Sequence, residues 1–414
     1  MDNIQKQAMA AKAAQRVLAK AESRSKNQAL IKLAELLETH QSDIFAANQE
    51  DVAFAKQKGL DAPRVNRLTI TANILEEMRN GVLHVAEFDD PIGVIEEEWQ
   101  RPNGLFVGKM RIPLGVICII YEARPNVTID AATLCIKAGC AVLLRGGSEA
   151  SHSNLCLVDL LQKALSDAGL PKDAVQFINV KDHAVVTELC HLDQYIDVMI
   201  PRGGFELVKK VTTEATMPVL KHFKGVCHLF VDAHCDLGKA LEITWNAKVQ
   251  RPGVCNALEC LLVHKDVSAQ FLPLVAKKLN TVEFRACPRA LPYLGKQAKA
   301  ISDNDFGFEF HDLILAVKVV DNFEQAIEHI AKYGSHHTEC ICTNNLELSR
   351  RFLREVDASM VGVNCSTRFN DGGQLGLGAE IGISTSKLHA YGPMGVRELT
   401  TTKFVVQGQG QVRD

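Results

Sequence analysis

Three features that would indicate a specialised class of protein are missing from this 414-residue sequence. It has 13 cysteines but no CxxC pair, so neither a zinc ribbon nor a thioredoxin-type redox motif is indicated. No apolar run reaches the roughly 18 residues that a membrane span needs. The net charge is only −3, which predicts no strong attraction to nucleic acid or to an anionic membrane surface.

The remaining composition is typical of a globular protein of the cytoplasm. Hydrophobic residues make up 47% of the chain and charged residues 23%. The N-terminal segment is polar with helical spacing and lacks the apolar stretch of a signal peptide. Most cysteines lie in apolar runs, as expected of buried thiols in a reducing compartment. A chain of this length should form two or three domains.

The spacing of apolar residues predicts an α/β fold. Helical spacing dominates the first part of the chain, and helices are expected within residues 27–59 and 71–88. From about residue 111, short β-rich runs alternate with helical segments, which is typical of a parallel sheet covered by helices. A second α/β block begins near residue 228, and residues 399–414 are expected to form an extended terminal strand. Parallel sheets bind ligands at the carboxyl ends of their strands.

Two glycine-rich turns follow predicted strands of the first sheet. One turn consists of Arg145, Gly146 and Gly147, and the other of Arg202, Gly203 and Gly204. Glycine lets a ligand approach the backbone, and an arginine beside a helix N-terminus favours an anion, so the pair indicates a phosphate-bearing cofactor. Ordinary strand-to-helix loops explain the same residues. Neither turn matches the G-x-G-x-x-G or P-loop motif, which disfavours kinase-type chemistry.

Cys255 and Asn126 occupy turns where they could take part in catalysis. Cys255 lies between a helical segment and the apolar run Ala257–Val263, where a thiol held by rigid elements could act as a nucleophile. Asn126 follows a strand, and its amide could donate to an oxyanion or simply cap the next helix. Histidines such as His222 and His336 have no metal-ligand framework around them, so no metal site is predicted.

Several motifs together resemble the γ-glutamyl phosphate reductases, the glutamate-5-semialdehyde dehydrogenases of the aldehyde dehydrogenase superfamily. The motifs are GVICIIYEARPNVTIDAATLCIKAGCAVLLRGGSEA, IDVMIPRGG, QRPGVCNALECLLV, VNCSTRFNDGG and GLGAEIGISTSKLHA. They occur in the family's order between about residues 5 and 405. The resemblance implies a Rossmann-type nucleotide-binding domain (1–97 and 110–228), an α/β catalytic domain (229–390) and a small extended oligomerisation element (98–109 and 391–414).

The resemblance also implies an activity, the NADPH-dependent reduction of γ-glutamyl phosphate in the second step of proline biosynthesis from glutamate. Cys255 takes the place of the family's nucleophile and would form a thioester, while Asn126 would stabilise the oxyanion. Arg145 or Arg202 could meet the 2′-phosphate of NADP, whereas Glu149 could meet ribose hydroxyls and favour NAD. The expected state is a cytoplasmic homo-oligomer, functionally coupled to glutamate 5-kinase.

The substrate's amino and carboxylate groups need partners, and three cations of the motif segments suit them. These are Arg124, Arg368 and Lys387, although each could equally form a structural ion pair. The family's usual KLHARGPMG reads KLHAYGPMG here, so Tyr391 replaces an arginine that could bind a carboxylate or a neighbouring subunit.

One absence bears on the choice of reaction. Hydrolytic aldehyde dehydrogenases have a glutamate that activates water, but the matching stretch, residues 217–232, has no carboxylate before Asp232. A thioester should therefore survive until phosphate or hydride reaches it. The rival interpretations are a hydrolytic or coenzyme A-acylating dehydrogenase, a non-catalytic nucleotide-sensing protein and a cysteine hydrolase.

Overall fold

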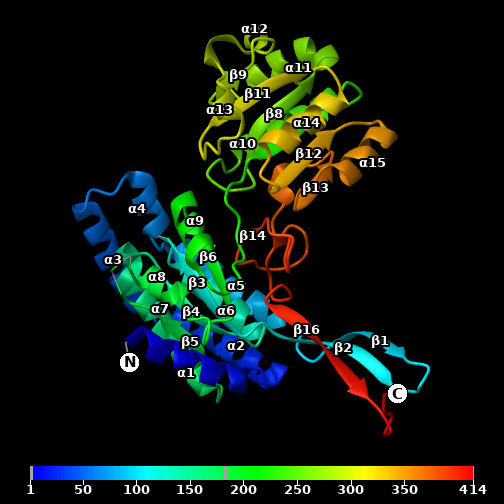
Figure 1. Ribbon diagram of the computed structural model, residues 1–414. Coiled ribbons are helices and arrows are strands. Elements are labelled where there is room, and N and C mark those ends of the chain that lie inside the picture. Colours follow the sequence, from blue (N-terminus) through cyan, green and yellow to red (C-terminus); the bar gives the residue numbers. More distant parts are fainter. Residues whose placement is uncertain (1–2, 123, 181, 183, 414) are drawn as a thin grey trace. The chain divides into compact units, whose positions relative to one another are not determined.

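The computed structural model describes residues 3–122, 124–180, 182 and 184–413. The chain forms two compact units, labelled by their elements in Figure 1. Unit 1 comprises residues 1–221, 377–382 and 394–414, and unit 2 comprises residues 222–376 and 383–393. Within the part of the chain described, no helix combines the length and apolar character needed to cross a membrane.

Unit 1 begins with five helices: α1 (Asn3–Leu18), α2 (Ser23–Thr39), α3 (Gln41–Gln57), α4 (Ala62–Leu68) and α5 (Ala72–Glu87). Their apolar residues recur at helical spacing; α2, for example, buries Leu30, Leu33 and Leu37 on one face. The side chain of Thr71 caps α5 by accepting from the backbone N–H of Ile74 at 3.3 Å. The two helices predicted within residues 27–59 are thus confirmed as α2 and α3, and the one predicted at 71–88 as α5.

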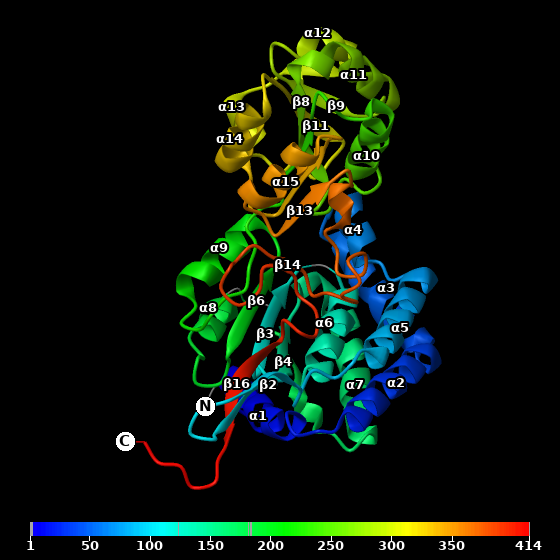
Figure 2. The same ribbon diagram turned by 90° about the vertical axis from the view of Figure 1, so that its right-hand side faces the viewer.

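A four-stranded parallel sheet forms the centre of unit 1, with strand order β5-β4-β3-β6. Its strands are β3 (Val116–Tyr121), β4 (Ala141–Arg145), β5 (Val175–Phe177) and β6 (Val198–Arg202). The connecting helices are α6 (Asn126–Lys137), α7 (Ser151–Asp167), α8 (Ala184–Cys190) and α9 (Phe205–Glu214). Strands β3 and β4 are buried along their whole length, which explains their unbroken apolar sequences. Figure 2 shows α6 and α7 beside this sheet.

A second sheet of unit 1 is antiparallel and exposed. It consists of β1 (Ile95–Gln100), β2 (Phe106–Pro113) and β16 (Thr400–Gln407), with β2 in the centre. Strand β16 pairs with β2 over its full length, from Thr400 opposite Pro113 to Gln407 opposite Phe106 (Figure 1). The predicted terminal strand is therefore present, paired with a segment nearly 300 residues earlier in the sequence.

Unit 2 contains a seven-stranded parallel sheet in the order β10-β9-β11-β8-β7-β12-β13. The strands are β7 (Cys227–Val231), β8 (Leu258–His264), β9 (Glu283–Ala286), β10 (Ala298–Ala300), β11 (Ile314–Val320), β12 (Thr338–Cys342) and β13 (Met360–Val363). The helices are α10 (Leu237–Val249), α11 (Lys265–Lys278), α12 (Leu291–Leu294), α13 (Asp303–Phe306), α14 (Phe323–Tyr333) and α15 (Leu346–Glu355). The short pair β14 (Ile383–Ser384) and β15 (Gly392–Pro393) completes the unit.

Alternate residues of the central strands of unit 2 face two separate cores. Leu229 and Val231 of β7 belong to the core that also contains Phe271 of α11. Phe230 belongs to the other core, with Phe323 of α14. This alternation follows from the period-two geometry of a strand. It places α11 and α14 on opposite faces of the sheet and fixes the direction of each strand residue.

Candidate active site

Cys255 lies in a half-buried turn between α10 and β8, as the sequence predicted. The turn is tight, because the backbone N–H of Ala257 donates to the carbonyl oxygen of Val254 at 3.0 Å. Strand β8 then runs into the buried sheet, where each residue from Leu258 to Val263 is buried. The thiol therefore stands at the amino-terminal end of β8, anchored by a rigid strand on one side and a helix on the other.

The backbone of Cys255 packs closely against the segment that leads into β7. Its carbonyl oxygen accepts a hydrogen bond from the Cys227 thiol at 3.2 Å. A Cβ atom at Gly225 would lie 2.1 Å from the same oxygen and 2.8 Å from the Cα atom of Cys255. No side chain fits in that space, so glycine at position 225 is what lets the nucleophile turn approach β7.

Asn256 connects the turn to the segment that follows β13. Its side-chain amide donates to the carbonyl oxygen of Asn370 at 2.8 Å. The Thr367 hydroxyl donates to the backbone oxygen of Asn256 at 2.7 Å. Asn370 is itself fully buried, and its amide donates to Thr338 Oγ1 at 2.8 Å and to Ser359 Oγ at 3.2 Å. The residue after the thiol is thus held by a continuous buried network.

Arg368 holds both ends of the same turn. Its Nε donates to Gln250 Oε1 at 2.9 Å, and its Nη1 donates to Asn256 Oδ1. Burial and the neighbouring Arg251 lower the pKa of Arg368, whereas Asp371 and the Cys255 thiol act to raise it. The guanidinium therefore lies close enough to interact electrostatically with the thiol, and a cation in that place favours the thiolate.

Asn126 is the first residue of α6 in unit 1, and the capping alternative for it is wrong. The N-cap position is Pro125, and the amide of Asn126 instead donates to Asp130 Oδ2 at 3.1 Å. Burial raises the pKa of Asp130 to about 6, while Asn126 and Arg202 act to lower it. An amide has two N–H bonds, so the contact with Asp130 fixes the group and leaves one N–H for another acceptor.

The turn after β4 carries a buried arginine. Arg145 is 6% exposed, and its Nε has no hydrogen-bond partner among the described residues. Burial lowers the pKa of Arg145, and Glu149 acts to raise it. A Cβ atom at Gly146 would lie 2.2 Å from Asn154 Nδ2, and one at Gly147 would lie 2.3 Å from Glu149 Oε1. A side chain at position 146 would therefore collide with the buried Asn154, whereas one at position 147 would have to displace the Glu149 carboxylate.

The turn after β6 differs because a carboxylate from another segment, that of Glu122, already occupies it. The backbone N–H of Gly204, at the start of α9, donates to Glu122 Oε1 at 3.2 Å. A Cβ atom at Gly203 would lie 2.7 Å from the same oxygen. The half-buried Arg202 packs against Gly382, where a Cβ would meet Nη1 at 2.1 Å. An anion placed at this helix N-terminus would face Glu122.

The other predicted substrate cations are separate from Arg368. Lys387 forms an ion pair with Asp357, Nζ to Oδ2, at 2.6 Å. The Tyr391 hydroxyl donates to the other oxygen of Asp357 at 3.3 Å, so the tyrosine takes part in the same surface cluster. Arg124 is half-buried ahead of α6, and its carbonyl oxygen accepts from Val127 at 3.0 Å.

The structure thus groups the predicted residues in three places. Arg368 contacts Asn256 beside Cys255 in unit 2, Lys387 meets Tyr391 at Asp357, and unit 1 holds Asn126 with both glycine turns. The residues that sequence reasoning missed are those that hold the thiol: Gly225, Cys227, Asn256, Thr367 and Asn370. Asn256, Thr367 and Asn370 lie in the motif segments, whereas Gly225 and Cys227 lie in the stretch 217–232, where only the lack of a carboxylate had been considered.

Comparisons with known proteins show the family to which this chain belongs. The sequence model of the aldehyde dehydrogenase family matches residues 1–289. Gamma-glutamyl phosphate reductase of Desulfovibrio desulfuricans is 63% identical over 409 residues, covering 97% of each chain. The protein of that name from Nitratidesulfovibrio vulgaris is 62% identical over 405 residues, again covering 97% of each.

Among solved structures, the crystal structure of gamma-glutamyl phosphate reductase from Thermotoga maritima is similar over the full length. It has a TM-score of 0.97 and 43% sequence identity, and the alignment covers 100% of both chains. The α/β fold predicted from the sequence is confirmed. The chain therefore belongs to the aldehyde dehydrogenase family and, within it, to the γ-glutamyl phosphate reductases.

Proposed function

We propose that this enzyme reduces γ-glutamyl phosphate to glutamate 5-semialdehyde and phosphate, with NADPH as reductant and Cys255 as nucleophile. The observation that carries the proposal is the 63% identity, over nearly the whole chain, to a protein of that activity. The Cys255 thiol, which lies in a turn fixed by neighbouring contacts, would supply the nucleophile that this activity needs. We further propose that the enzyme is a cytoplasmic homo-oligomer. Because acyl phosphates are labile, glutamate 5-kinase would supply γ-glutamyl phosphate to it directly.

Acyl transfer is the first step. The Cys255 thiolate attacks the acyl carbon, a C–S bond forms, and the C–O bond to phosphate breaks as phosphate leaves. Arg368 supports the thiolate form through its charge, and its bonds to Gln250 and Asn256 keep the turn in one position. The N–H of Asn126 that Asp130 leaves available would donate to the oxyanion.

The β4 turn fits the cofactor better than the β6 turn does. Arg145 offers a buried Nε without a partner among the described residues, and the two residues that follow it, Gly146 and Gly147, carry no side chain. The β6 turn already has the Glu122 carboxylate on its helix N-terminus. We therefore assign Arg145 to the 2′-phosphate of NADP; Glu149, which interacts with Arg145, is the residue that would instead meet the ribose hydroxyls of NAD. When bound, the nicotinamide supplies the hydride that converts the thioester to the aldehyde.

Water is a poor competitor for the thioester in this account. Glu259 is the carboxylate nearest in sequence after Cys255, but both its oxygens are engaged. One accepts from Lys248 at 2.9 Å, and the other from the backbone N–H of His311 at 3.2 Å. Burial raises the pKa of Glu259 to about 7, although Lys248 acts to lower it. A carboxylate occupied in this way cannot accept a proton from attacking water.

The reverse reaction tests the proposal. Glutamate 5-semialdehyde and NADP are mixed with and without phosphate, and the reduced nicotinamide is followed by absorbance. We expect turnover only with phosphate, loss of turnover in Cys255→Ala, and retention in the matched control Cys287→Ala. Replacing phosphate with coenzyme A, and NADP with NAD, tests the acceptor and the cofactor. Equal turnover without phosphate would refute the acyl-phosphate route.

A further inference from the structure

Three metal-ligating side chains meet inside unit 2, away from the turn described above. They are His228 of β7, Cys260 of β8 and His329 of α14, all buried, with one potential ligand atom from each within 4.8 Å of the others. His228 and Cys260 are direct partners across two neighbouring strands. Cys260 belongs to the core that α14 covers, so strand geometry places the thiol opposite His329.

His228 is oriented by a carboxylate. Its Nδ1 lies 2.9 Å from Glu339 Oε2, and its backbone N–H donates to the same oxygen at 3.0 Å. The contact leaves Nε2 for the cluster, and Nε2 is buried with no hydrogen-bond partner among the described residues. Metal-bound histidines are held in this way, with one nitrogen on a carboxylate and the other on the metal.

The spacing of the other two ligands suits tetrahedral zinc. Cys260 Sγ and His329 Nε2 are 3.6 Å apart. With a Zn–S bond of about 2.3 Å, a Zn–N bond of about 2.05 Å and a tetrahedral angle, the two ligand atoms should be about 3.6 Å apart. Two histidine nitrogens on the same zinc ion should be about 3.3 Å apart. The ligand atoms of the cluster lie at most 4.8 Å apart, so the two nitrogens need to approach each other by about 1.5 Å at most to bind the ion.

Lys318 is the charged neighbour that binding must accommodate. Its Nζ lies 3.0 Å from His329 Nδ1, on the side of the ring away from Cys260. For His329 to ligate through Nε2, the ring releases its Nε2 proton to solvent and Nδ1 takes one proton from the Lys318 ammonium, which then accepts from Nδ1–H as an amine. Cys260 loses its thiol proton to solvent. The thiolate and the Glu339 carboxylate then balance the charge of a divalent ion.

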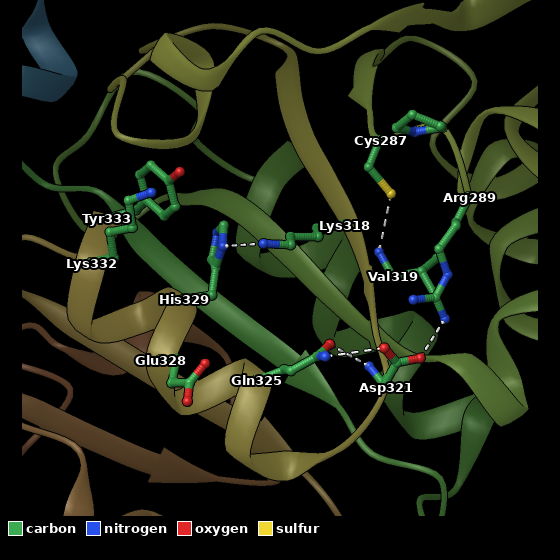
Figure 3. A pocket seen from close by; sticks show the side chains of 11 residues that line it. Cys287, Arg289, Lys318, Val319, Asp321, Gln325, Glu328, His329, Lys332 and Tyr333 are labelled. Carbon is green, nitrogen blue, oxygen red and sulfur yellow. Dashed lines mark hydrogen bonds and ion pairs between the residues drawn. The ribbon is translucent and has the colours of Figure 1, made fainter.

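One member of the cluster, His329, borders a cavity on the α14 side. A cavity of about 610 Å³ is lined by His329 and Lys318 together with Cys287, Arg289, Glu328 and Tyr333, among others. Figure 3 shows His329 and Lys318 side by side in its wall. None of the residues predicted from sequence lines this cavity.

We propose that His228, Cys260 and His329 bind a divalent cation of borderline softness, Zn²⁺ being the best match, with Glu339 orienting His228. Two histidines and a thiolate form the donor set that zinc favours, and three protein ligands leave a fourth position for water. The ion would link β7, β8 and α14. Its effect should be to raise the thermal stability of the protein, since only the folded chain brings the three ligands together.

The test uses the full chain with Cys255→Ser, which removes one of the half-buried thiols that could take up metal. Co²⁺ is titrated in, and the thiolate-to-cobalt charge-transfer absorption is followed; Zn²⁺ uptake is measured by equilibrium dialysis. We expect saturation at one equivalent, displacement of Co²⁺ by Zn²⁺, and a higher Tm with Zn²⁺. Glu339→Gln should weaken binding about 10–100-fold.

Matched variants decide the outcome. Cys260→Ala and His329→Gln should each lose the absorption, while Cys287→Ala, which removes another buried thiol beside the cavity, should keep it. If Cys260→Ala fails to fold by circular dichroism, His329→Gln alone decides, since its ring borders the cavity. No saturable binding, or uptake unchanged in His329→Gln, would mean an adventitious metal only and would overturn the proposal.

Discussion

Replacing Gly225 with alanine should slow catalysis by displacing Cys255. An added Cβ would lie 2.1 Å from the Cys255 carbonyl oxygen, whereas such contacts below 3.0 Å essentially do not occur. The turn must therefore retreat by about 0.9 Å, the difference between these two distances. The backbone of Gly225 is not in the left-handed region, so this contact and not φ strain is the cause.

A displacement of about 1 Å at a reacting group can lower the rate about 100-fold, which corresponds to about 2.7 kcal/mol. Overpacking should also lower stability by about 1–3 kcal/mol. The assays are kcat in the phosphate-dependent oxidation of glutamate 5-semialdehyde and Tm by calorimetry. The acceptor dependence should not change, because the substitution moves the nucleophile without altering the chemistry.

Gly307→Ala is the matched control for this substitution. Gly307 is in unit 2 with a φ of −100°, and an added Cβ would first meet Tyr333 at 3.8 Å, an ordinary contact. It should leave kcat unchanged. If Gly225→Ala had a kcat within about twofold of the Gly307→Ala value, the close packing of the turn would not position the thiol, and the reasoning would fail.

Three further substitutions test other contacts. Lys248→Met leaves the buried Glu259 carboxylate without its only ion-pair partner among the described residues, and should cost about 3–5 kcal/mol near pH 8 by urea unfolding. Because the pKa of Glu259 is raised in the folded state, it gains a proton as pH falls, so the deficit should shrink toward pH 5; a pH-independent deficit would contradict this. Thr367→Val removes the hydroxyl donor to the Asn256 carbonyl and should lower stability by about 1–3 kcal/mol, whereas Thr367→Ser should not. Tyr391→Phe loses only an exposed hydrogen bond to Asp357, so the free energy of unfolding should fall by no more than about 1 kcal/mol. A larger drop would contradict this.

The sequence predicted the features that depend on local spacing. The helix before Cys255 ends at Val249 and the strand after it begins at Leu258, as the apolar pattern indicated. The buried strands β3 and β4 and the terminal strand β16 were also predicted, because a short unbroken or alternating apolar run is compatible with few structures other than a strand.

The supporting contacts of the site could not be predicted because they join distant segments. Asn256 bonds to Asn370 across 114 positions, and Cys227 reaches Cys255 across 28. Asn126 was weighed as a helix cap because asparagine is a common N-cap, yet Pro125 takes that position and Asp130, one turn later, binds the amide. Propensity describes a residue's average surroundings, and tertiary packing decides the particular one.

A rapid-mixing experiment without phosphate tests the central claim most directly. Enzyme is mixed with glutamate 5-semialdehyde and excess NADP, and the reduced nicotinamide formed per Cys255 is counted. A thiol that forms a thioester, with the Glu259 carboxylate engaged by Lys248 and His311, should give a burst of one equivalent followed by near-zero turnover. Peptide mapping should find the acyl group on Cys255. Continued turnover at the phosphate-supported rate would show that water resolves the thioester, and absence of a burst would show that Cys255 forms none.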